Sequence, residues 1–293
     1  MTTMTTHSLG TFGVEVDAKL AASIDEDLAE ELRRSLFEHQ LLVFRDQHLS
    51  LDAQQSLMAV FGPVIPAPEG VGLVSNVRPD GMLGAQELAF HSDASFAPVP
   101  YRALSLLATD VVDGATATRF ASGRDAYTRL PDDLAARVAN LEVLHVYDPD
   151  DYQHRARADA TGPRTVHPVV LPHPDTGEPV LFATELASAT ILGLAADDSE
   201  RLLDELFGYL YDPTYVVEQR WNRGDLVVWD NVALQHARDR VDDAPRTLQR
   251  VVIGQRSVQE MFPVAAVEAA FAAQVPGSIA ASDGAHEERD DRS

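Results

Sequence analysis

Cysteine is absent from the 293 residues, and lysine occurs once, at Lys19. Without cysteine the chain cannot form a disulfide, a thiolate zinc site or a cysteine-ligated iron–sulfur cluster, and it has no cysteine nucleophile. Lys19 lies outside any GxxxxGK[ST] pattern, which argues against a P-loop, and its position in the N-terminal stretch argues against a lysine Schiff base. Any metal or redox chemistry therefore has to use histidine, aspartate and glutamate.

Positive charge is also scarce, because 23 Lys and Arg face 46 Asp and Glu, for a net charge of −23 and an isoelectric point near 4.6. An acidic surface argues against nucleic acids and anionic membranes as partners, since both need a basic footprint. No apolar run reaches the ~18 residues that a membrane span needs. The N-terminal MTTMTTHSLG has neither a basic region nor an apolar region of a secretory signal. We expect a cytoplasmic protein.

The chain is predicted to be mainly β with flanking helices, as in a β-sandwich or a jelly roll. Apolar and β-branched segments predict strands at 41–44, 102–112, 141–147, 167–172, 179–183, 214–220, 225–229 and 247–254. Helical periodicity and capping residues predict helices at 24–39, 50–61, 123–139 and 197–210. We expect one domain over 1–275, lid-like irregular loops at about 64–88 and 148–166, and a disordered acidic tail at 276–293.

The segment Phe90-His91-Ser92-Asp93 carries the first candidate metal ligands. On a strand, residues two apart point to the same face, so His91 and Asp93 can converge on one ion. They would supply two of the three ligands of the 2-His-1-carboxylate triad of non-haem iron oxygenases. The tripeptide alone is common by chance, and taken alone it more often marks a solvated polar strand end than a metal site.

Two later segments strengthen the metal hypothesis. A buried strand ending near Trp229 and Asp230 runs into a loop that delivers His236. Arg246 and Arg250 follow on another apolar strand, four residues apart and therefore on one face. Buried arginines are costly unless they meet anions, and their planar donors suit carboxylates. Structural salt bridges in an acidic protein are the alternative explanation for this pair.

With these motifs in place, residues 8–256 resemble the TauD/TfdA family of Fe(II)- and 2-oxoglutarate-dependent dioxygenases. The resemblance also includes the following segments: Thr118-x-Phe120-Ala121, Ala126-Tyr127-x-x-Leu130-Pro131, His167-Pro-Val-Val, His173-Pro-x-Thr-Gly177 and Trp221-x-x-Gly-Asp-Leu-x-x-Trp-Asp-Asn231. It implies a double-stranded β-helix with flanking helices, and Fe(II), 2-oxoglutarate and O2 as cofactor and co-substrates.

The resemblance also implies residue roles. His91, Asp93 and His236 would bind and activate iron, and Thr118 and Arg246 would bind the distal carboxylate of 2-oxoglutarate. Arg250 would lie near the 1-carboxylate and near an anionic group of the substrate. The implied reaction oxidises, by hydroxylation, a C–H bond of a small organic and in some members anionic substrate, with release of succinate and CO2.

Several positions depart from the family pattern and concern the substrate. Phe90 replaces the usual tryptophan, and Ala115-Thr116-Ala117 replaces Gly-Gly-Asp. Phe90, Glu87, Phe96 and Arg250 are the candidate substrate residues. Desaturation, cyclisation or oxidative decarboxylation at the same iron site are alternative outcomes, and a non-catalytic jelly-roll protein that binds metal and anion is an alternative function. The apolar stretch Met261–Ala273 fits either a homo-oligomer contact or a packed terminal segment.

Overall fold

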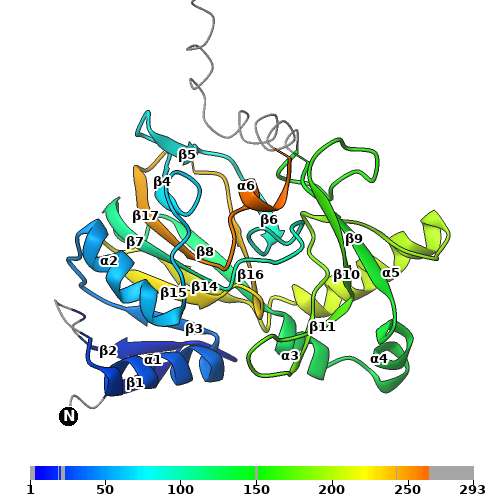
Figure 1. Cartoon of the computed structure of the whole chain (residues 1–293), viewed down its shortest axis with the longest axis horizontal. Coiled ribbons are helices and arrows are strands. Elements are labelled where there is room, and N and C mark those ends of the chain that lie inside the picture. Colours follow the sequence, from blue (N-terminus) through cyan, green and yellow to red (C-terminus); the bar gives the residue numbers. More distant parts are fainter. Residues whose placement is uncertain (1–3, 19, 21–23, 149–150, 242, 264–293) are drawn as a thin grey trace, which may run out of the picture.

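Two β-sheets face each other at the centre of the structure and hold the main core between them (Figure 1). The computed structural model describes residues 4–18, 20, 24–148, 151–241 and 243–263. In spatial order the larger sheet contains β1 (Thr5–Ser8), β2 (Val14–Asp17), β3 (Leu41–Phe44), β15 (Leu226–Asp230), β7 (Ala103–Val111), β17 (Arg246–Ile253), β4 (Val71–Ser75) and β5 (Gly81–Leu83). The smaller sheet contains β14 (Val217–Arg220), β8 (Ala117–Ser122), β16 (Leu234–Arg238) and β6 (Leu88–His91). This arrangement confirms the predicted jelly-roll core.

The central strands of the larger sheet are buried on both faces. Every residue of β15 is buried. One face of this strand meets the smaller sheet, where the rings of Trp229 and Phe120 lie 5.5 Å apart. The other face packs under helices, where Val228 shares a core with Leu32 and Leu36. A strand that is covered on both faces has a continuous apolar sequence, which is why this segment could be predicted as a strand.

Helices α1 (Glu26–His39) and α2 (Leu51–Met58) cover the outer face of the larger sheet, and the short 3-10 helix η1 (Ala59–Phe61) follows α2 (Figure 1). Asp25 caps α1 by accepting a hydrogen bond from Leu28 N at 2.9 Å, and Ser50 caps α2 in the same way through Ala53 N at 3.2 Å. Both helices therefore begin within two residues of the predicted starts.

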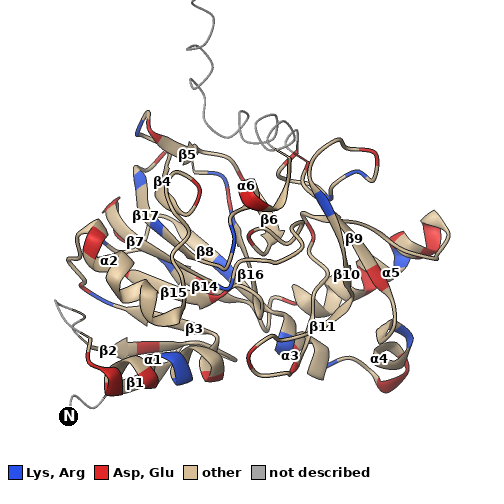
Figure 2. Ribbon diagram, in the orientation of Figure 1, with Lys and Arg blue, Asp and Glu red and all other residues tan. Residues whose placement is uncertain are grey.

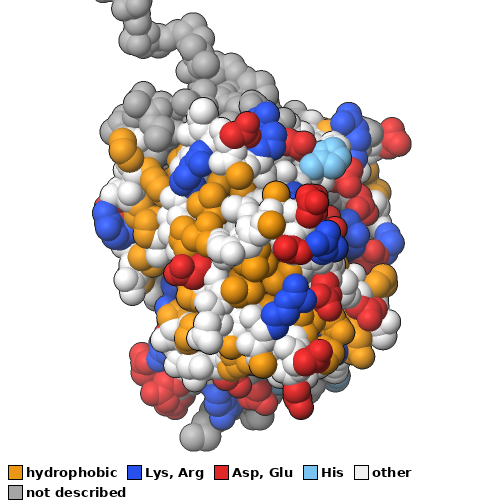
Figure 3. All heavy atoms as spheres, turned by 90° about the vertical axis from the view of Figure 1, so that its right-hand side faces the viewer, with side chains coloured by type: hydrophobic (Ala, Val, Ile, Leu, Met, Phe, Trp, Pro, Cys, Tyr) orange, Lys and Arg blue, Asp and Glu red, His pale blue; other side chains and the backbone are white. Residues whose placement is uncertain are grey.

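A second group of elements lies beside the sandwich. It comprises β9 (Glu142–Val146), β10 (Arg164–Pro168), β11 (Val170–Pro172), β12 (Pro179–Leu181), β13 (Ser188–Ile191), α3 (Gly123–Thr128), α4 (Asp132–Val138) and α5 (Ala196–Leu210). The short helix α6 (Val258–Met261) packs instead against the core of the sandwich. These strands form a three-stranded sheet, β10-β9-β13, and a two-stranded sheet, β11-β12. Figure 3 shows this side of the molecule, where apolar side chains lie among charged ones.

Two sequence predictions need correction here. The helix predicted over 123–139 is divided into α3 and α4, because Pro131 lacks an amide hydrogen and restricts the preceding residue, so it starts a new helix instead of continuing one. The segment predicted as an irregular loop over about 64–88 contains β4 and β5. β4 pairs with β17, and β5 pairs with β4 in parallel, so the segment extends the edge of the larger sheet.

The other lid-like segment, 148–166, has no regular structure in its described part until β10 begins at Arg164. The predicted tail, 276–293, lies outside the described residues, as does all but the start of Met261–Ala273. Within the described ranges, none of the helices has the length and apolar character needed to cross a bilayer.

Candidate metal centre and its two cavities

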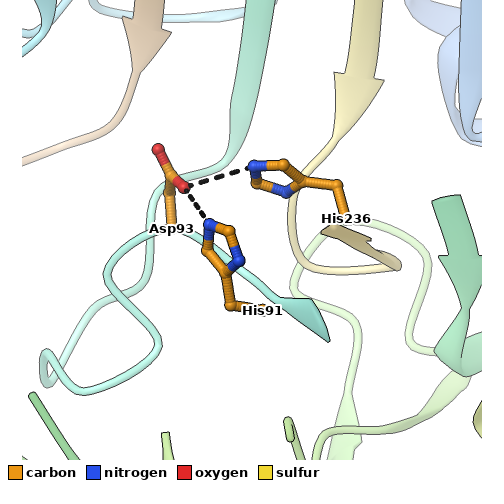
Figure 4. A group of neighbouring side chains, drawn as sticks. All are labelled: His91, Asp93 and His236. Carbon is orange, nitrogen blue, oxygen red and sulfur yellow. Dashed lines mark ion pairs between the residues drawn. The ribbon is translucent and has the colours of Figure 1, made fainter. Parts of the chain in front are cut away.

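Two histidines and an aspartate lie close together at the paired strands β6 and β16 of the smaller sheet. His91 ends β6, His236 lies in the middle of β16, and the two residues are direct antiparallel partners. The candidate ligand atoms of His91, Asp93 and His236 all lie within 4.8 Å of one another. Figure 4 shows both rings turned toward one carboxylate oxygen of Asp93. The structure thus brings together the three residues of the predicted triad.

The local reasons for this meeting differ from the sequence prediction. β6 ends at His91, so Asp93 lies in the following turn and not on the same strand. His236 is part of a regular strand, where a loop was predicted. Asn231 holds the turn in place: its Oδ1 accepts from Asp93 N at 2.9 Å, and its Nδ2 donates to Asp93 O at 3.0 Å and to Tyr101 O at 2.9 Å. No role for Asn231 was predicted from the sequence.

The protonation states of the cluster suit a metal ion. The carbonyl of Ala89 can only accept a hydrogen bond, so His91 Nδ1, 2.8 Å away, is the donor, and Nε2 is the ring nitrogen that faces the cluster. Burial lowers the pKa of His236 to about 3, and the neighbouring His91 adds to that effect, so this ring is neutral at physiological pH. Two imidazole nitrogens and one carboxylate oxygen form the donor set of a facial triad.

Arg250 pairs with the oxygen of Asp93 that faces away from the histidines. Asp93 Oδ1 lies 3.4 Å from His91 Nε2 and 3.6 Å from His236 Nε2, whereas Oδ2 accepts from Arg250 Nη2 at 2.5 Å. Burial opposes the charge of Asp93, but Arg250 and the two histidines outweigh it and hold the pKa of the carboxyl well below its usual range. The carboxylate therefore offers one oxygen to a metal and the other to a cation.

A small cavity of about 50 Å³ borders the triad, and Thr118 and Arg246 contribute to its wall. Arg246 is 2% exposed and donates from Nη2 to Thr118 Oγ1 at 3.2 Å. Its Nε and Nη1 are buried and have no hydrogen-bond partner among the described residues. Burial lowers the pKa of Arg246 to about 9. A buried guanidinium with free donors is costly unless an anion binds to it, and the geometry of a carboxylate matches its planar donors.

Thr118 completes this anion site. Its hydroxyl accepts from Trp221 Nε1 at 3.0 Å as well as from Arg246. A hydroxyl has two acceptor positions and one donor, so the proton of Thr118 Oγ1 is left to donate to a ligand. Figure 2 shows basic segments on β17, within the larger sheet, whereas many acidic segments lie on the outer helices and turns. The −23 charge therefore describes the surface and not this cavity.

A larger cavity, of about 240 Å³, also borders the triad and is mostly apolar. Its wall includes three tyrosines, Tyr101, Tyr147 and Tyr152, together with Phe96. No sequence motif marks these tyrosines, because residues scattered over separate loops form a cavity only after folding. Arg250, His91 and Asp93 border both cavities.

Two of the predicted substrate residues lie elsewhere. Phe90 stacks on Tyr211 with ring centroids 4.3 Å apart, on the opposite side of β6 from His91. It borders neither cavity. Glu87 is partly buried and also borders neither cavity. Of the four candidates, Phe96 and Arg250 contribute to the wall of the larger cavity.

The sequence profile described as "Taurine catabolism dioxygenase TauD, TfdA family" matches residues 4–252. The chain belongs to the TauD/TfdA family. It is 32% identical over 249 residues to the (S)-phenoxypropionate/alpha-ketoglutarate-dioxygenase of Sphingobium herbicidovorans, covering 77% of this chain and 85% of that one. It is also 32% identical over 274 residues to the alpha-ketoglutarate-dependent 2,4-dichlorophenoxyacetate dioxygenase of Cupriavidus pinatubonensis, covering 83% and 94%.

Solved structures of TauD/TfdA-type proteins share this fold. A taurine dioxygenase from Burkholderia xenovorans superimposes with a TM-score of 0.74 at 24% identity, over 88% of this chain and 94% of that one. AAD-2, in complex with Mn(II) and N-oxalylglycine, superimposes with a TM-score of 0.73 at 26% identity, over 87% and 99%. The chain is thus an Fe(II)- and 2-oxoglutarate-dependent dioxygenase, and the predicted fold, enzyme class and cofactors are confirmed.

Proposed function

We propose that His91 Nε2, Asp93 Oδ1 and His236 Nε2 bind the iron of this dioxygenase, and that Thr118 and Arg246 bind the distal carboxylate of 2-oxoglutarate. One observation supports the proposal: residues of the triad border both a cavity with unpaired cationic donors and a cavity with an apolar wall. The first suits a small dicarboxylate and the second suits an organic substrate. Three protein ligands leave further coordination positions for small molecules.

When bound, Fe(II) activates O2 while 2-oxoglutarate is oxidised to succinate and CO2, and the substrate C–H bond is oxidised. The protein residues position the metal ligands and the co-substrate for this chemistry. Ala89 fixes the tautomer of His91, and Arg250 occupies Asp93 Oδ2, so that the carboxylate binds through Oδ1. Arg246 and Thr118 orient the co-substrate by its distal end. Deletion of any of these contacts should weaken binding or misorient a reactant.

The substrate that fits best is a small organic acid with an apolar body. The larger cavity offers aromatic and aliphatic side chains for the body, and Arg250, 12% exposed at the border, offers a cation for the acid group. Two similar dioxygenases are named for phenoxypropionate and 2,4-dichlorophenoxyacetate, and another relative, from Pseudomonas putida, is named for sulfate esters. All three names describe organic anions, which supports an anionic substrate here.

Hydroxylation is the outcome that we propose, since a hydroxylation-type reaction fits these relatives. Product mass separates it from the alternatives: hydroxylation adds one oxygen atom, whereas desaturation and cyclisation remove a pair of hydrogens. If the hydroxylated carbon carries an oxygen substituent, the product breaks into two fragments, and the fragments identify that carbon. The cytoplasmic location and the homo-oligomer stay predictions of the sequence.

The test is substrate-dependent release of succinate with Fe(II), ascorbate and 2-oxoglutarate. The panel pairs aryloxy-carboxylates and alkyl sulfates with their neutral amides or alcohols, so that charge and shape are tested separately. We expect turnover with a subset of the anions, little with the neutral analogues, and none in His91→Ala or Asp93→Ala. Turnover that survives in either variant would refute the metal assignment. Neutral substrates preferred over anions would refute the substrate class, and binding of 2-oxoglutarate without consumption across the panel would favour the non-catalytic function.

A further inference from the structure

Arg238 is a second buried arginine beside the small cavity, and the family resemblance assigns it no role. It lies at the end of β16, two residues after His236, and is 4% exposed. It forms part of the cavity wall together with Arg246. Its Nε donates to Gln86 O at 2.8 Å, and its Nη2 donates to Leu83 O at 2.9 Å and to Gly84 O at 3.0 Å.

The charges around the small cavity do not balance. Three arginines contribute to its wall, but Asp93 is the one carboxylate among its described residues, and Asp93 pairs with Arg250. Arg238 and Arg246 have no ion-pair partner in the described part of the chain. Burial lowers the pKa of Arg238 to about 10, and its charge contributes to the lowered pKa of Arg246. Two buried cations beside one cavity are costly unless an anion joins them.

The hydrogen bonds of Arg238 leave part of its guanidinium for such an anion. The three carbonyls of residues 83–86 engage Nε and Nη2 and fix the side chain. Within the described ranges, no residue accepts a hydrogen bond from Nη1. A guanidinium that carbonyls fix along one edge, in a residue of the cavity wall, is pre-organised to bind, since little freedom remains to be lost.

We propose that Arg238 binds the distal carboxylate of 2-oxoglutarate together with Arg246, and so makes this dioxygenase demand a dicarboxylate co-substrate. The inference rests on the proposed function, which places 2-oxoglutarate in this cavity. A carboxylate has four acceptor positions, enough for Thr118, Arg246 and Arg238 together. A 2-oxo acid with a methyl group at the distal end would leave both cations buried without a counter-charge. The pair of arginines therefore discriminates by charge at the far end of the co-substrate, away from the metal.

The experiment compares two ligands that differ at that end alone, 2-oxoglutarate and 2-oxopentanoate. Binding is measured by calorimetry without oxygen, with Mn(II) in place of iron, so that no turnover is needed. In Arg238→Met we expect the affinity for 2-oxoglutarate to fall on the order of 10- to 100-fold, the usual loss for a hydrogen bond between charged groups. The affinity for 2-oxopentanoate should change by less than about threefold, because this ligand has no charge to lose.

Three further variants separate charge from loop support. Arg238→Gln keeps a donor for a loop carbonyl but removes the charge, and should lose the same preference as Arg238→Met. Arg238→Lys keeps the charge and should recover most of the preference for 2-oxoglutarate. Arg220→Met removes an arginine that is 62% exposed on β14 and should leave both affinities unchanged. Circular dichroism and thermal unfolding show which variants are folded, and the affinity ratio is compared within each folded variant.

The outcomes are distinct. If both neutral variants keep the wild-type ratio of affinities, or weaken the two ligands equally, Arg238 supports the 83–86 loop and the inference is overturned. The proposed function is judged separately by Arg246→Met. If the wild-type protein does not bind 2-oxoglutarate, or if Arg246→Met binds it as tightly as wild type, the placement of the co-substrate is refuted and the inference with it.

Discussion

Arg250 Nη2 lies 2.5 Å from Asp93 Oδ2, so the two residues form an ion pair at the edge of the metal centre. The arginine that the family resemblance assigns to ligand anions is thus already bound to a protein carboxylate. Its Nη1 donates to Glu69 O at 2.7 Å. The contact joins the triad, the β17 strand and the loop before β4, so one residue affects both metal binding and the wall of the substrate cavity.

Replacement of Arg250 should weaken metal binding. Arg250→Gln leaves Asp93 Oδ2 without its cation and frees the carboxylate to rotate, and the loss of such an outer contact typically costs about 10- to 100-fold in metal affinity. Titration with Mn(II) measures this, and Arg250→Lys should retain more affinity than Arg250→Gln. If the KM of the organic acid is unchanged in both variants, the proposed contact between Arg250 and the substrate anion is contradicted.

Asn231 should be needed to hold Asp93 in place. Asn231→Ala removes three buried hydrogen bonds and leaves the amide of Asp93 without its partner, which should cost about 2–4 kcal/mol of unfolding free energy. The metal affinity should fall as well, because the turn that presents the carboxylate loosens. Urea unfolding and Mn(II) titration report the two effects. Asn222→Ala, at an exposed turn, is the control, and equal behaviour of the two variants would contradict the positioning role.

Phe96 and Phe90 should differ in their effect on the substrate. Phe96 borders the larger cavity beside Tyr147, with ring centroids 4.9 Å apart, so Phe96→Ala should enlarge the cavity and raise the KM of the organic substrate about tenfold. Phe90→Ala should destabilise the fold by about 3 kcal/mol and leave the order of substrate preference unchanged. Steady-state kinetics of both variants over the substrate panel measure the KM values and the order of preference. A changed preference in Phe90→Ala would restore the original sequence prediction for that residue.

His145 should make stability fall in acid. It is fully buried on β9, where Nδ1 donates to Ser95 O at 3.0 Å, and burial, reinforced by the nearby His167, lowers its pKa to about 3. The unfolded chain takes up a proton below about pH 6.5 and the folded chain does not until about pH 3. This contribution is therefore complete above about pH 6.5 and is lost as the pH falls, by at most about 1.4 kcal/mol per unit.

Urea unfolding between about pH 7 and about pH 5 measures this slope. His145→Gln should be less stable at neutral pH but should show a flatter dependence on pH, because the titrating group is gone. His154, on an exposed segment with 77% of its side chain accessible, supplies the control His154→Gln, whose slope should match wild type. A slope in His145→Gln as steep as in wild type would contradict a buried neutral His145.

Features that depend on neighbouring residues were predictable from the sequence. The start of α1 at Asp25 and of α2 at Ser50 follows from capping contacts across three residues. β15 was predictable because a strand buried on both faces is apolar throughout. β4 and β5 were missed because both are short, each contains one glycine, and neither has a strong periodicity. β4 becomes a strand by pairing with β17, far along the chain, and β5 then pairs with β4 at the edge of the sheet.

By itself, the sequence determined the inventory of the site: no thiols, one lysine, and the His91, Asp93 and His236 motif with two arginines on one strand. The family resemblance followed from the order of those motifs. Only the tertiary structure decided which charge meets which. Asp93 pairs with Arg250 across 157 residues, and Arg238 reaches the same cavity as Arg246. Such partners depend on how strands align across two sheets, and no pattern within a short window records that alignment.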